Sequence, residues 1–398
     1  MIGKTKPNSD RDMKVLFLIF HGFAPWNGIS KKIGYQCDAL RRCGADVRLC
    51  YTDFGPDGSQ RRMIDGQVLE NFGTGLRAKI RKRTAYRKVA QYVLREGVEM
   101  VYIRSAHNAN PFLNRLLRRL HRHGVRLAME IPTYPYEGQF RDSPLKDKLR
   151  LALDRICRRK TARYLDRIVT FTDLPRIFGV PTVCISNGID FGRIPVKSGR
   201  NAAEDVFRLT GVAELHYWHG YDRVIRGLAE YCREPQPTEV IFNIVGEGAE
   251  AERTRLRELT ARLGLEGRVI FHGNRAGAEL DEIFERTDMG IASLGRHRSG
   301  NTKIKTLKNR EYAARGIPFV YSETDDDFDG MPYVLKAPAN DDPVDIAGLL
   351  RFWRSLEMSP GQIRATVEPA LSWDVQMRKV LTEMFPEKPE PGCSPERG

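Results

Sequence analysis

A polar loop that runs into a helix is the segment of this 398-residue chain whose side chains are best placed to do chemistry. The loop carries Lys303 and Lys305, residues 306–314 have the pattern of a helix that carries Glu311, and Gly316 ends that helix. The first N–H groups of a helix lack partners within the helix, and together with the helix dipole they favour anions. The segment therefore predicts a site for a ligand that carries phosphate.

Short apolar runs alternate with helical patterns along the whole chain, which predicts parallel sheets covered by helices. The apolar runs lie at 13–20, 46–51, 100–103, 126–131, 167–171 and 182–185, and then at 205–212, 239–245, 268–272 and 289–294. The fold class is α/β, with two sequential Rossmann-like, doubly wound halves. We expect a flexible leader over 1–12, an N-terminal domain over 13–190, a linker over 191–204, a second domain over 205–358, a helical segment over 359–384 that packs back, and a disordered tail over 385–398.

The composition is 41% hydrophobic and 29% charged, as in globular proteins. No apolar run approaches the roughly 20 residues that span a bilayer. The seven cysteines are scattered and form no C-x-x-C pair, which predicts a reduced protein without a structural zinc. We therefore expect a cytoplasmic protein.

Charge is divided unevenly between the two halves. Residues 1–200 hold 39 Lys and Arg against 18 Asp and Glu, whereas residues 201–398 hold 26 against 33. A basic half suits an acidic ligand, nucleic acid or an anionic membrane. We find no motif of a nucleic-acid-binding fold and expect no nucleic-acid partner. Residues 76–96 have helical spacing of apolar residues among basic ones, which fits either a solvated helix or contact with the inner face of the cell membrane.

Several short tracts of the second half occur in an order that is typical of one family. They are Gly246-Glu247-Gly248 after a strand, Leu263-Gly264-Leu265, Val269 to Gly273, Arg286-Thr287-Asp288 and Arg315-Gly316-Ile317-Pro318, preceded by Ile185-Ser186-Asn187-Gly188-Ile189-Asp190. This order resembles the C-terminal domain of GT-B glycosyltransferases, particularly retaining family 4. The resemblance implies the GT-B fold, with two Rossmann-like domains that face a central cleft.

The resemblance also implies a donor site. Glu311 fits the glutamate that holds the ribose of a sugar nucleotide, and Leu307 fits the position whose N–H meets the distal phosphate. The full set of predicted donor-binding residues is Gly28, Ser30, Asn187, Gly246, Glu247, Gly248, Lys303, Lys305, Thr306, Leu307 and Glu311. Glycine in the tract 246–248 lets a backbone approach a ligand, although a plain tight turn accounts for the same residues.

The chain departs from the family pattern at its anionic and cationic positions. Lys303 stands where a glutamate is expected, Thr306 replaces a glycine, and Glu214 and His219 stand where an Arg and a Lys clamp the diphosphate. We interpret the cations Arg296, Arg298, Lys303 and Lys305 as a relocated clamp, against the alternative of a solvated basic loop. Asp325-Asp326-Asp327 is expected to be a solvated turn, and no metal site is expected.

Polar residues also follow the strands of the first half. Arg104 and His107 follow the run 100–103, and Glu130 stands at the end of the next run. The carboxyl ends of parallel strands meet at one edge, where doubly wound folds bind ligands. We predict Arg104, His107 and Glu130 as catalytic residues beside the acceptor, with Tyr134 and Tyr136 against a sugar face.

The resemblance implies an activity as well. The chain would move a hexose from a UDP- or GDP-sugar to a hydroxyl of a saccharide or lipid-linked saccharide, with retention and with neither metal nor cofactor. Such a reaction belongs to polysaccharide or glycoconjugate biosynthesis. Two alternatives remain open at this point: a non-catalytic relative that binds nucleotide sugars or carbohydrate, and a GT-B-like sugar-nucleotide epimerase.

Overall fold

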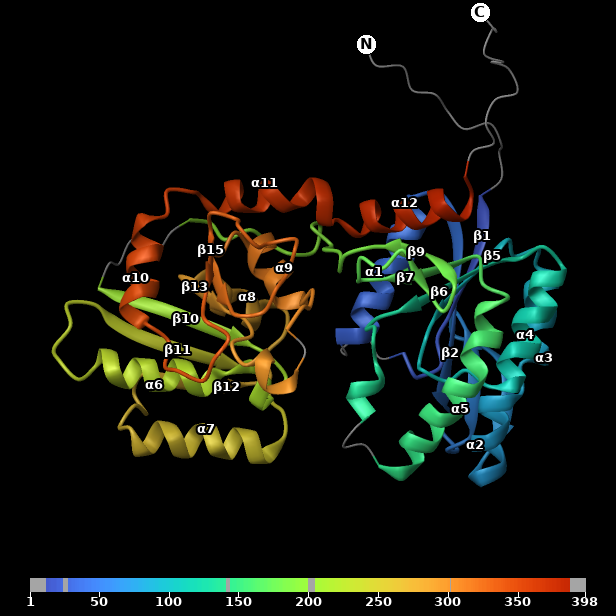
Figure 1. Cartoon of the computed structure of the whole chain (residues 1–398), viewed down its shortest axis with the longest axis horizontal. Helices are drawn as coiled ribbons and strands as arrows, with labels where there is room; N and C mark the ends of the chain where they lie inside the picture. The colour runs from blue at the N-terminus through green and yellow to red at the C-terminus, as the bar shows by residue number, and fades with distance from the viewer. Residues whose placement is uncertain (1–11, 24–27, 141–143, 200–204, 301, 387–398) are drawn as a thin grey trace, which may run out of the picture. The chain divides into compact units, whose positions relative to one another are not determined.

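The computed structural model describes residues 12–23, 28–140, 144–199, 205–300 and 302–386. All but two residues of the expected tail and all but one residue of the expected leader thus lie outside the described residues. The chain forms two compact units (Figure 1). Unit 1 comprises the chain up to Ile185 and again from Trp373, and unit 2 comprises Ser186–Ser372.

Unit 1 is built on a nine-stranded sheet in the order β4-β3-β2-β1-β5-β6-β7-β9-β8. Its strands are β1 Met13–Leu18, β2 Ala45–Phe54, β3 Gln60–Ile64, β4 Gln67–Gly73, β5 Met100–Arg104, β6 Arg126–Ile131, β7 Arg167–Thr170, β8 Arg176–Ile177 and β9 Val180–Cys184. The six strands β1, β2, β5, β6, β7 and β9 are parallel, and Leu16 of β1 pairs with Arg48 of β2 and Val101 of β5. β3, β4 and β8 join antiparallel at the two edges.

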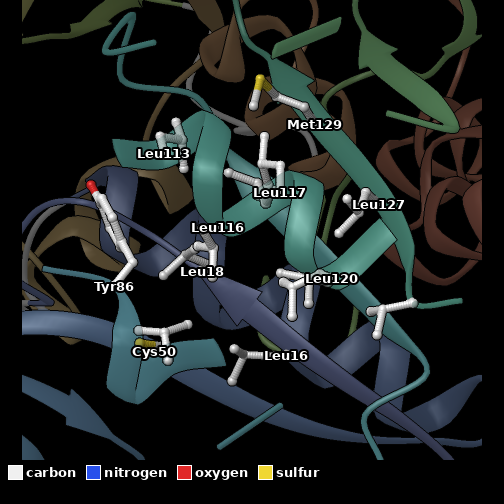
Figure 2. Packing of buried hydrophobic residues seen from close by; sticks show 14 of the residues in the cluster. Leu16, Leu18, Cys50, Tyr86, Leu113, Leu116, Leu117, Leu120, Leu127 and Met129 are labelled. Carbon is white, nitrogen blue, oxygen red and sulfur yellow. The ribbon is translucent and has the colours of Figure 1, made fainter. Parts of the chain in front are cut away.

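Helices cover both faces of this sheet because its central strands are apolar on both sides. Leu16 and Leu18 of β1 point into one core, and Val15 and Phe17 point into the other. The first core is covered by α3 Arg87–Arg95, α4 Pro111–Arg122 and α5 Leu145–Ala162, and the second by α1 Gly28–Arg42 and α12 Trp373–Met384. Figure 2 shows four leucines of α4, Leu113, Leu116, Leu117 and Leu120, packed with Leu16, Leu18 and Leu127.

Unit 2 has a six-stranded sheet in the order β12-β11-β10-β13-β14-β15, and all its neighbouring strands are parallel. The strands are β10 Val206–Val212, β11 Glu239–Val245, β12 Val269–Gly273, β13 Met289–Ile291, β14 Phe319–Tyr321 and β15 Val334–Lys336. The helices are η2 Tyr217–His219, α6 Tyr221–Tyr231, α7 Glu250–Arg262, α8 Ala278–Glu285, η3 Arg296–Ser299, α9 Leu307–Arg315, α10 Ile346–Ser355 and α11 Pro360–Leu371. The chain runs outward from β10 to β12 and returns to the other side of β10 at β13, so the topological switch point lies between β10 and β13.

The α/β class and the doubly wound sheets are therefore as predicted, and several boundaries differ. The chain passes from unit 1 to unit 2 after Ile185, and the described part of the expected linker, 191–199, belongs to unit 2. The helical segment expected over 359–384 breaks at Ser372 into α11, which packs on α9 in unit 2, and α12, which belongs to unit 1. The reason is burial, since Trp373 and Met377 fill the core of unit 1 against α1.

Residues 76–96 form two helices rather than one. α2 spans Gly75–Thr84 with Ala85 as its C-cap residue, and α3 begins at Arg87. The guanidinium of Arg62 donates hydrogen bonds to the carbonyls of Lys82 and Ala85 at this break, which satisfies the end of α2. The apolar side of α3 lies in the core of unit 1. Of the segment that the sequence predicted as a basic surface helix, only α2 therefore keeps its apolar residues at the surface.

Candidate functional site

Four ionisable or polar side chains follow the adjacent strands β10, β13 and β14 of unit 2. His219 belongs to η2 after β10, Arg296 to η3 after β13, Glu323 lies two residues after β14, and Lys308 is in the first turn of α9. We refer to these four residues as the polar cluster. They lie at the carboxyl ends of the strands that flank the switch point, where open parallel sheets bind ligands.

The backbone holds the first two members together. The amide of Leu294 donates to the carbonyl of His219 at 2.9 Å, and Gly295 donates to Trp218 at 3.2 Å. Gly220, with φ 68, permits this approach, because a Cβ there would lie 2.8 Å from the nitrogen of Gly295. A side chain at Gly220 would therefore push η2 away from η3 and separate His219 from Arg296.

Each member of the polar cluster carries at least one buried polar atom that lacks a hydrogen-bond partner among the described residues. His219 and Glu323 are buried, and Lys308 has a half-exposed stem whose terminal nitrogen is nevertheless buried. Among the residues that the structure describes, no hydrogen-bond partner reaches His219 Nδ1, Arg296 Nε, Lys308 Nζ or either carboxylate oxygen of Glu323. Each unsatisfied buried group costs about 1–3 kcal/mol, and native proteins keep few of them. Four residues with unsatisfied buried polar atoms at one end of the sheet indicate a binding site, in which a polar ligand would supply the missing hydrogen bonds.

The members of the polar cluster shift one another's pKa. Burial lowers the pKa of Lys308 to about 7, and the charge of Arg296 acts in the same direction while Glu323 opposes it. Burial raises the pKa of Glu323 to about 7. Burial, followed by Lys308 and Arg296, lowers the pKa of His219 well below its usual value. An anion that enters the site would favour the charged forms of the basic members of the polar cluster.

The N-terminus of α9 adds to the attraction for an anion. Thr306 caps the helix by accepting a hydrogen bond from the amide of Asn309, and the first turn contains no acidic residue. Lys308 occupies that turn instead, although a cation is disfavoured beside the positive end of the helix dipole. An anion that lies against this turn would offset both the dipole and the ammonium.

Three of the four cations that the sequence assigns to the clamp already have carboxylate partners. Lys303 Nζ lies 2.8 Å from Asp326, Lys305 Nζ lies 3.4 Å from Asp327, and Arg298 pairs with Asp222 at 2.8 Å and with Asp341 at 2.7 Å. Arg296, by contrast, belongs to the polar cluster. The clamp role of Lys303 and Lys305 stays a prediction, and the geometry favours Arg296 and Lys308 for it.

The expectation that Asp325–Asp327 form a solvated turn is wrong for Asp325 and Asp327, whereas Asp326 is exposed. Asp325 is 0% exposed and accepts two hydrogen bonds from the buried Arg310, at 2.7 and 3.2 Å. Arg310 also binds Asp327, and its Nε donates to the carbonyl of Asn187 at 3.0 Å. The side-chain Nδ2 of Asn187 in turn donates to the carbonyl of Lys305 at 2.6 Å. Asn187, predicted to bind the donor, thus ties the loop before α9 in place.

Glu311 lies one turn after Lys308 on α9, so the two side chains share one side of the helix. Its carboxylate accepts hydrogen bonds from Arg315 at 3.1 and 3.2 Å, and Arg315 also pairs with Asp281 of α8. Leu307 has a half-exposed side chain in the first turn. The structure therefore brings Glu311, Thr306 and Leu307 beside the polar cluster, while their contacts with a donor stay predictions.

The tract 246–248 is explained by packing. Leu215 donates its amide to the carbonyl of Glu247 at 2.7 Å, and a Cβ on Gly246 or Gly248 would lie 1.9 Å from Ala213 O or 2.3 Å from Leu215 O. Both glycines are needed because the backbone of this tract packs directly against that of Ala213 and Leu215. This structural role agrees with the alternative stated in the sequence analysis, in which the glycines form a tight turn. Their contact with a donor stays a prediction.

In unit 1, Glu130 is the centre of a saturated ionic cluster. Its carboxylate accepts hydrogen bonds from Lys32 at 3.3 Å, Gln36 at 2.7 Å, Tyr102 at 2.7 Å and Arg104. Burial alone would raise the pKa of Glu130, but Lys32 and Arg104, with the hydrogen bonds, lower it to about 2. The cluster fixes α1, which begins with Gly28 and the buried Ser30, to β5 and β6. A catalytic role for Arg104 and Glu130 stays a prediction.

His107 lies after β5 in a left-handed backbone conformation, with φ 51. Its ring stacks on Tyr136 with centroids 3.9 Å apart, and burial lowers its pKa. Among the described residues its Nδ1 has no hydrogen-bond partner. Strained backbone and an unsatisfied ring nitrogen are features of residues that act on a ligand. They support the predicted role of His107 without testing it.

Sequence reasoning missed Lys308 and Glu323. The signal for Lys308 was present, since a lysine without any acid in the first turn of a predicted helix is unfavourable unless an anion is bound. Glu323 gave no comparable signal, because its position beside Lys308 depends on the neighbouring strands β13 and β14.

Within the described residues no group of three or more His, Cys, Asp or Glu is placed to hold a metal ion. None of the helices in the same residues is long and apolar enough to cross a membrane.

Comparisons with known proteins identify the fold. No family model and no curated protein matches the sequence. Sucrose-phosphate synthase from Thermosynechococcus elongatus is similar in structure, with a TM-score of 0.63 at 13% identity over 94% of this chain and 98% of that one. A glycosyltransferase from Rickettsia africae has a TM-score of 0.60 at 11% identity, with 95% and 100% of the chains covered. Anabaena HepE in complex with UDP has a TM-score of 0.57 at 14% identity over 94% of this chain and 100% of that one. A structure of HepE with UDP-glucose is similar as well. The fold is GT-B, as predicted.

Proposed function

We propose that this GT-B protein is a glycosyltransferase that takes a hexose from a nucleotide-diphosphate sugar, a UDP- or GDP-sugar. The acceptor is a hydroxyl of a saccharide or lipid-linked saccharide, in polysaccharide or glycoconjugate biosynthesis. The fold supports the class of enzyme, and structures of Anabaena HepE, which has a similar fold, are of its complexes with UDP and with UDP-glucose. The donor and acceptor proposed for this chain follow from the family resemblance of its sequence.

The polar cluster is the observation that carries the proposal. It combines three basic side chains with one acid at the switch point of unit 2, and all four are short of hydrogen bonds. A diphosphate has the charge and the acceptor oxygens to satisfy Lys308, Arg296 and His219 together with the N-terminus of α9. A ribose or sugar hydroxyl can donate to Glu323, whose carboxylate has no donor among the described residues.

In the reaction, the acceptor oxygen forms a bond to the anomeric carbon while the bond between that carbon and the diphosphate oxygen breaks. The nucleoside diphosphate leaves with the electron pair of the broken bond, and the proton of the acceptor hydroxyl passes to the departing diphosphate. Lys308 and Arg296 would neutralise the charge that develops on that leaving group, which is the main way in which a preorganised site lowers such a barrier. These two cations supply what a divalent ion supplies elsewhere, so we propose a metal-independent reaction. Retention of configuration follows only from the family resemblance and is part of the proposal.

Two observations favour a second candidate, a non-catalytic relative that binds nucleotide sugars. Lys303 stands where the family has a glutamate and pairs with Asp326, and Glu130 is fully engaged by its four donors. Such a protein would keep the polar cluster and bind UDP without turnover.

The test uses the purified full chain with a panel of UDP- and GDP-hexoses. We expect one donor to raise the midpoint of thermal unfolding, because a ligand that binds only the native state stabilises it. The same donor should be hydrolysed or transferred to saccharide acceptors in the presence of EDTA, measured by chromatography of the released nucleotide. Binding without release would favour the second candidate, isomerisation of the donor alone would indicate an epimerase, and failure of all donors to bind would overturn the proposal.

A further inference from the structure

Helix α5 of unit 1 turns its apolar residues to the solvent. Leu145 is 72% exposed, Leu149 63%, Leu153 43% and Ile156 77%. With about 3.6 residues per turn, these positions form a single stripe along the helix. A single exposed apolar side chain is ordinary on a protein surface, whereas four aligned along one helix form a patch that is typical of a binding surface.

Hydrogen bonds on the opposite side fix this orientation. Asp154 accepts from the amide of Ala109 at 2.9 Å and from the hydroxyl of Tyr136 at 2.7 Å. Thr161 donates to Asn114 of α4 at 2.5 Å. A rotation of α5 that buried the leucines would break these bonds and leave Asp154 without partners. The exposure of the stripe is therefore built into the packing of α5 beside α4 (Figure 1).

Basic residues flank the apolar stripe on both sides. With helical spacing, Lys148, Arg155 and Arg159 lie along one flank, and Lys146 lies along the other, while Lys160 lies near the C-terminal end. All five are exposed. The two acids of α5 do not offset them, because Asp147 pairs with Arg150 and Asp154 is buried.

We propose that α5 docks unit 1 on an anionic lipid surface, with the four apolar side chains between headgroups and acyl chains. Long basic side chains on both flanks can extend to the lipid phosphates while their stems cover apolar area. Leucines on one face and basic residues beside them are the pattern of a helix that lies in a membrane interface. A second copy of the chain is a poorer occupant, because a symmetric contact would bring the same five cations together.

This assignment differs from the one made on residues 76–96. There, Val89 and Val93 are buried in the core of unit 1, and only Leu76 and Ile80 of α2 are exposed. The docking of α5 goes beyond the proposed transfer reaction and does not depend on it, since no residue of the polar cluster takes part.

The test is cosedimentation of the full chain with vesicles of phosphatidylcholine that contain about one third phosphatidylglycerol. The variant is Leu149→Gln/Ile156→Gln, and the control is Val68→Gln, an exposed apolar residue at the edge strand β4. We expect wild type and control to bind equally, and the double variant to bind roughly tenfold more weakly or worse, given the apolar area withdrawn from the lipid. Unchanged midpoints of thermal unfolding would show that all three proteins are folded.

Equal binding of the double variant and the wild type would overturn the proposal, and so would equal binding of the wild type to pure phosphatidylcholine. Self-association that the double variant abolishes, without any vesicle binding, would assign the stripe to a second copy. Binding of UDP by the double variant is expected to be unchanged, which separates this test from that of the proposed function.

Discussion

Lys308 is the residue whose replacement best distinguishes a ligand site from a structural defect. Lys308→Met removes a buried ammonium that lacks hydrogen bonds, so we expect the midpoint of thermal unfolding to stay the same or rise. The affinity for UDP should fall roughly ten- to a hundredfold, which corresponds to about 1.5–3 kcal/mol for a charge-assisted hydrogen bond. The affinity for uridine should change much less. Calorimetric titration with both ligands measures the difference.

Lys303→Met is the matched control, because Lys303 is exposed and pairs with Asp326. We expect a smaller loss of affinity for UDP than in Lys308→Met. If the order of the two variants were reversed, the clamp would lie in the loop, as the sequence alone predicts.

The polar cluster also predicts proton uptake when UDP binds. In the free protein, burial lowers the pKa of Lys308 to about 7 and raises that of Glu323 to about 7. A bound diphosphate stabilises the charged ammonium and destabilises the charged carboxylate, so both pKa values rise and the complex holds more protons. The affinity for UDP should therefore fall as the pH increases above about 7, by up to about tenfold per pH unit for each proton taken up.

Calorimetry at one pH in two buffers of different ionisation enthalpy counts these protons. Lys308→Met should take up fewer of them than the wild type. A binding heat that does not depend on the buffer would show that no member of the polar cluster changes its protonation.

At the scale of elements, α9 is held by the buried pair of Arg310 and Asp325. Asp325→Ala would leave a buried guanidinium with less counter-charge, and we expect a loss of about 3 kcal/mol in the free energy of unfolding of unit 2. The control, Asp326→Ala, removes an exposed ion pair with Lys303 and should cost less than about 1 kcal/mol. Urea unfolding followed by fluorescence measures both. Equal losses would mean that the buried pair does not anchor α9.

The same elements show what the sequence can and cannot predict. Helix α9 was predicted within one residue because Thr306 caps it and Gly316, with φ 74, ends it, and both signals are local. The sequence did not predict the hairpin formed by β3 Gln60–Ile64 and β4 Gln67–Gly73. These segments carry several polar residues and lack a clear strand pattern, and they form strands because they pair with each other and with β2 in the folded sheet. Within the site, the sequence predicted the basic loop that carries Lys303 and Lys305. It did not predict the ion pairs of these lysines with Asp326 and Asp327, because only the fold brings the two segments into contact.

At the scale of the whole molecule, the chain leaves unit 1 after Ile185 and returns to it at Trp373. The sequence placed the first of these boundaries at residue 190 and gave no sign of the second. The second was missed because the helical periodicity of residues 359–384 continues through the break at Ser372. Only burial distinguishes the two parts, with Val367 in the core of unit 2 and Trp373 in that of unit 1.

This division predicts that two buried tryptophans report on different units. Trp373→Ala should destabilise unit 1, and Trp353→Ala, which removes a ring 5.3 Å from Phe207, should destabilise unit 2, each by about 3–5 kcal/mol. UDP binds unit 2 in our proposal, so it should raise the thermal transition that Trp353→Ala lowers and leave the other unchanged. Differential scanning calorimetry of each variant with and without UDP resolves the two. If Trp373→Ala lowered the midpoint of the thermal transition that UDP raises, α12 would stabilise unit 2. That result would contradict the packing of α12 on α1 in unit 1.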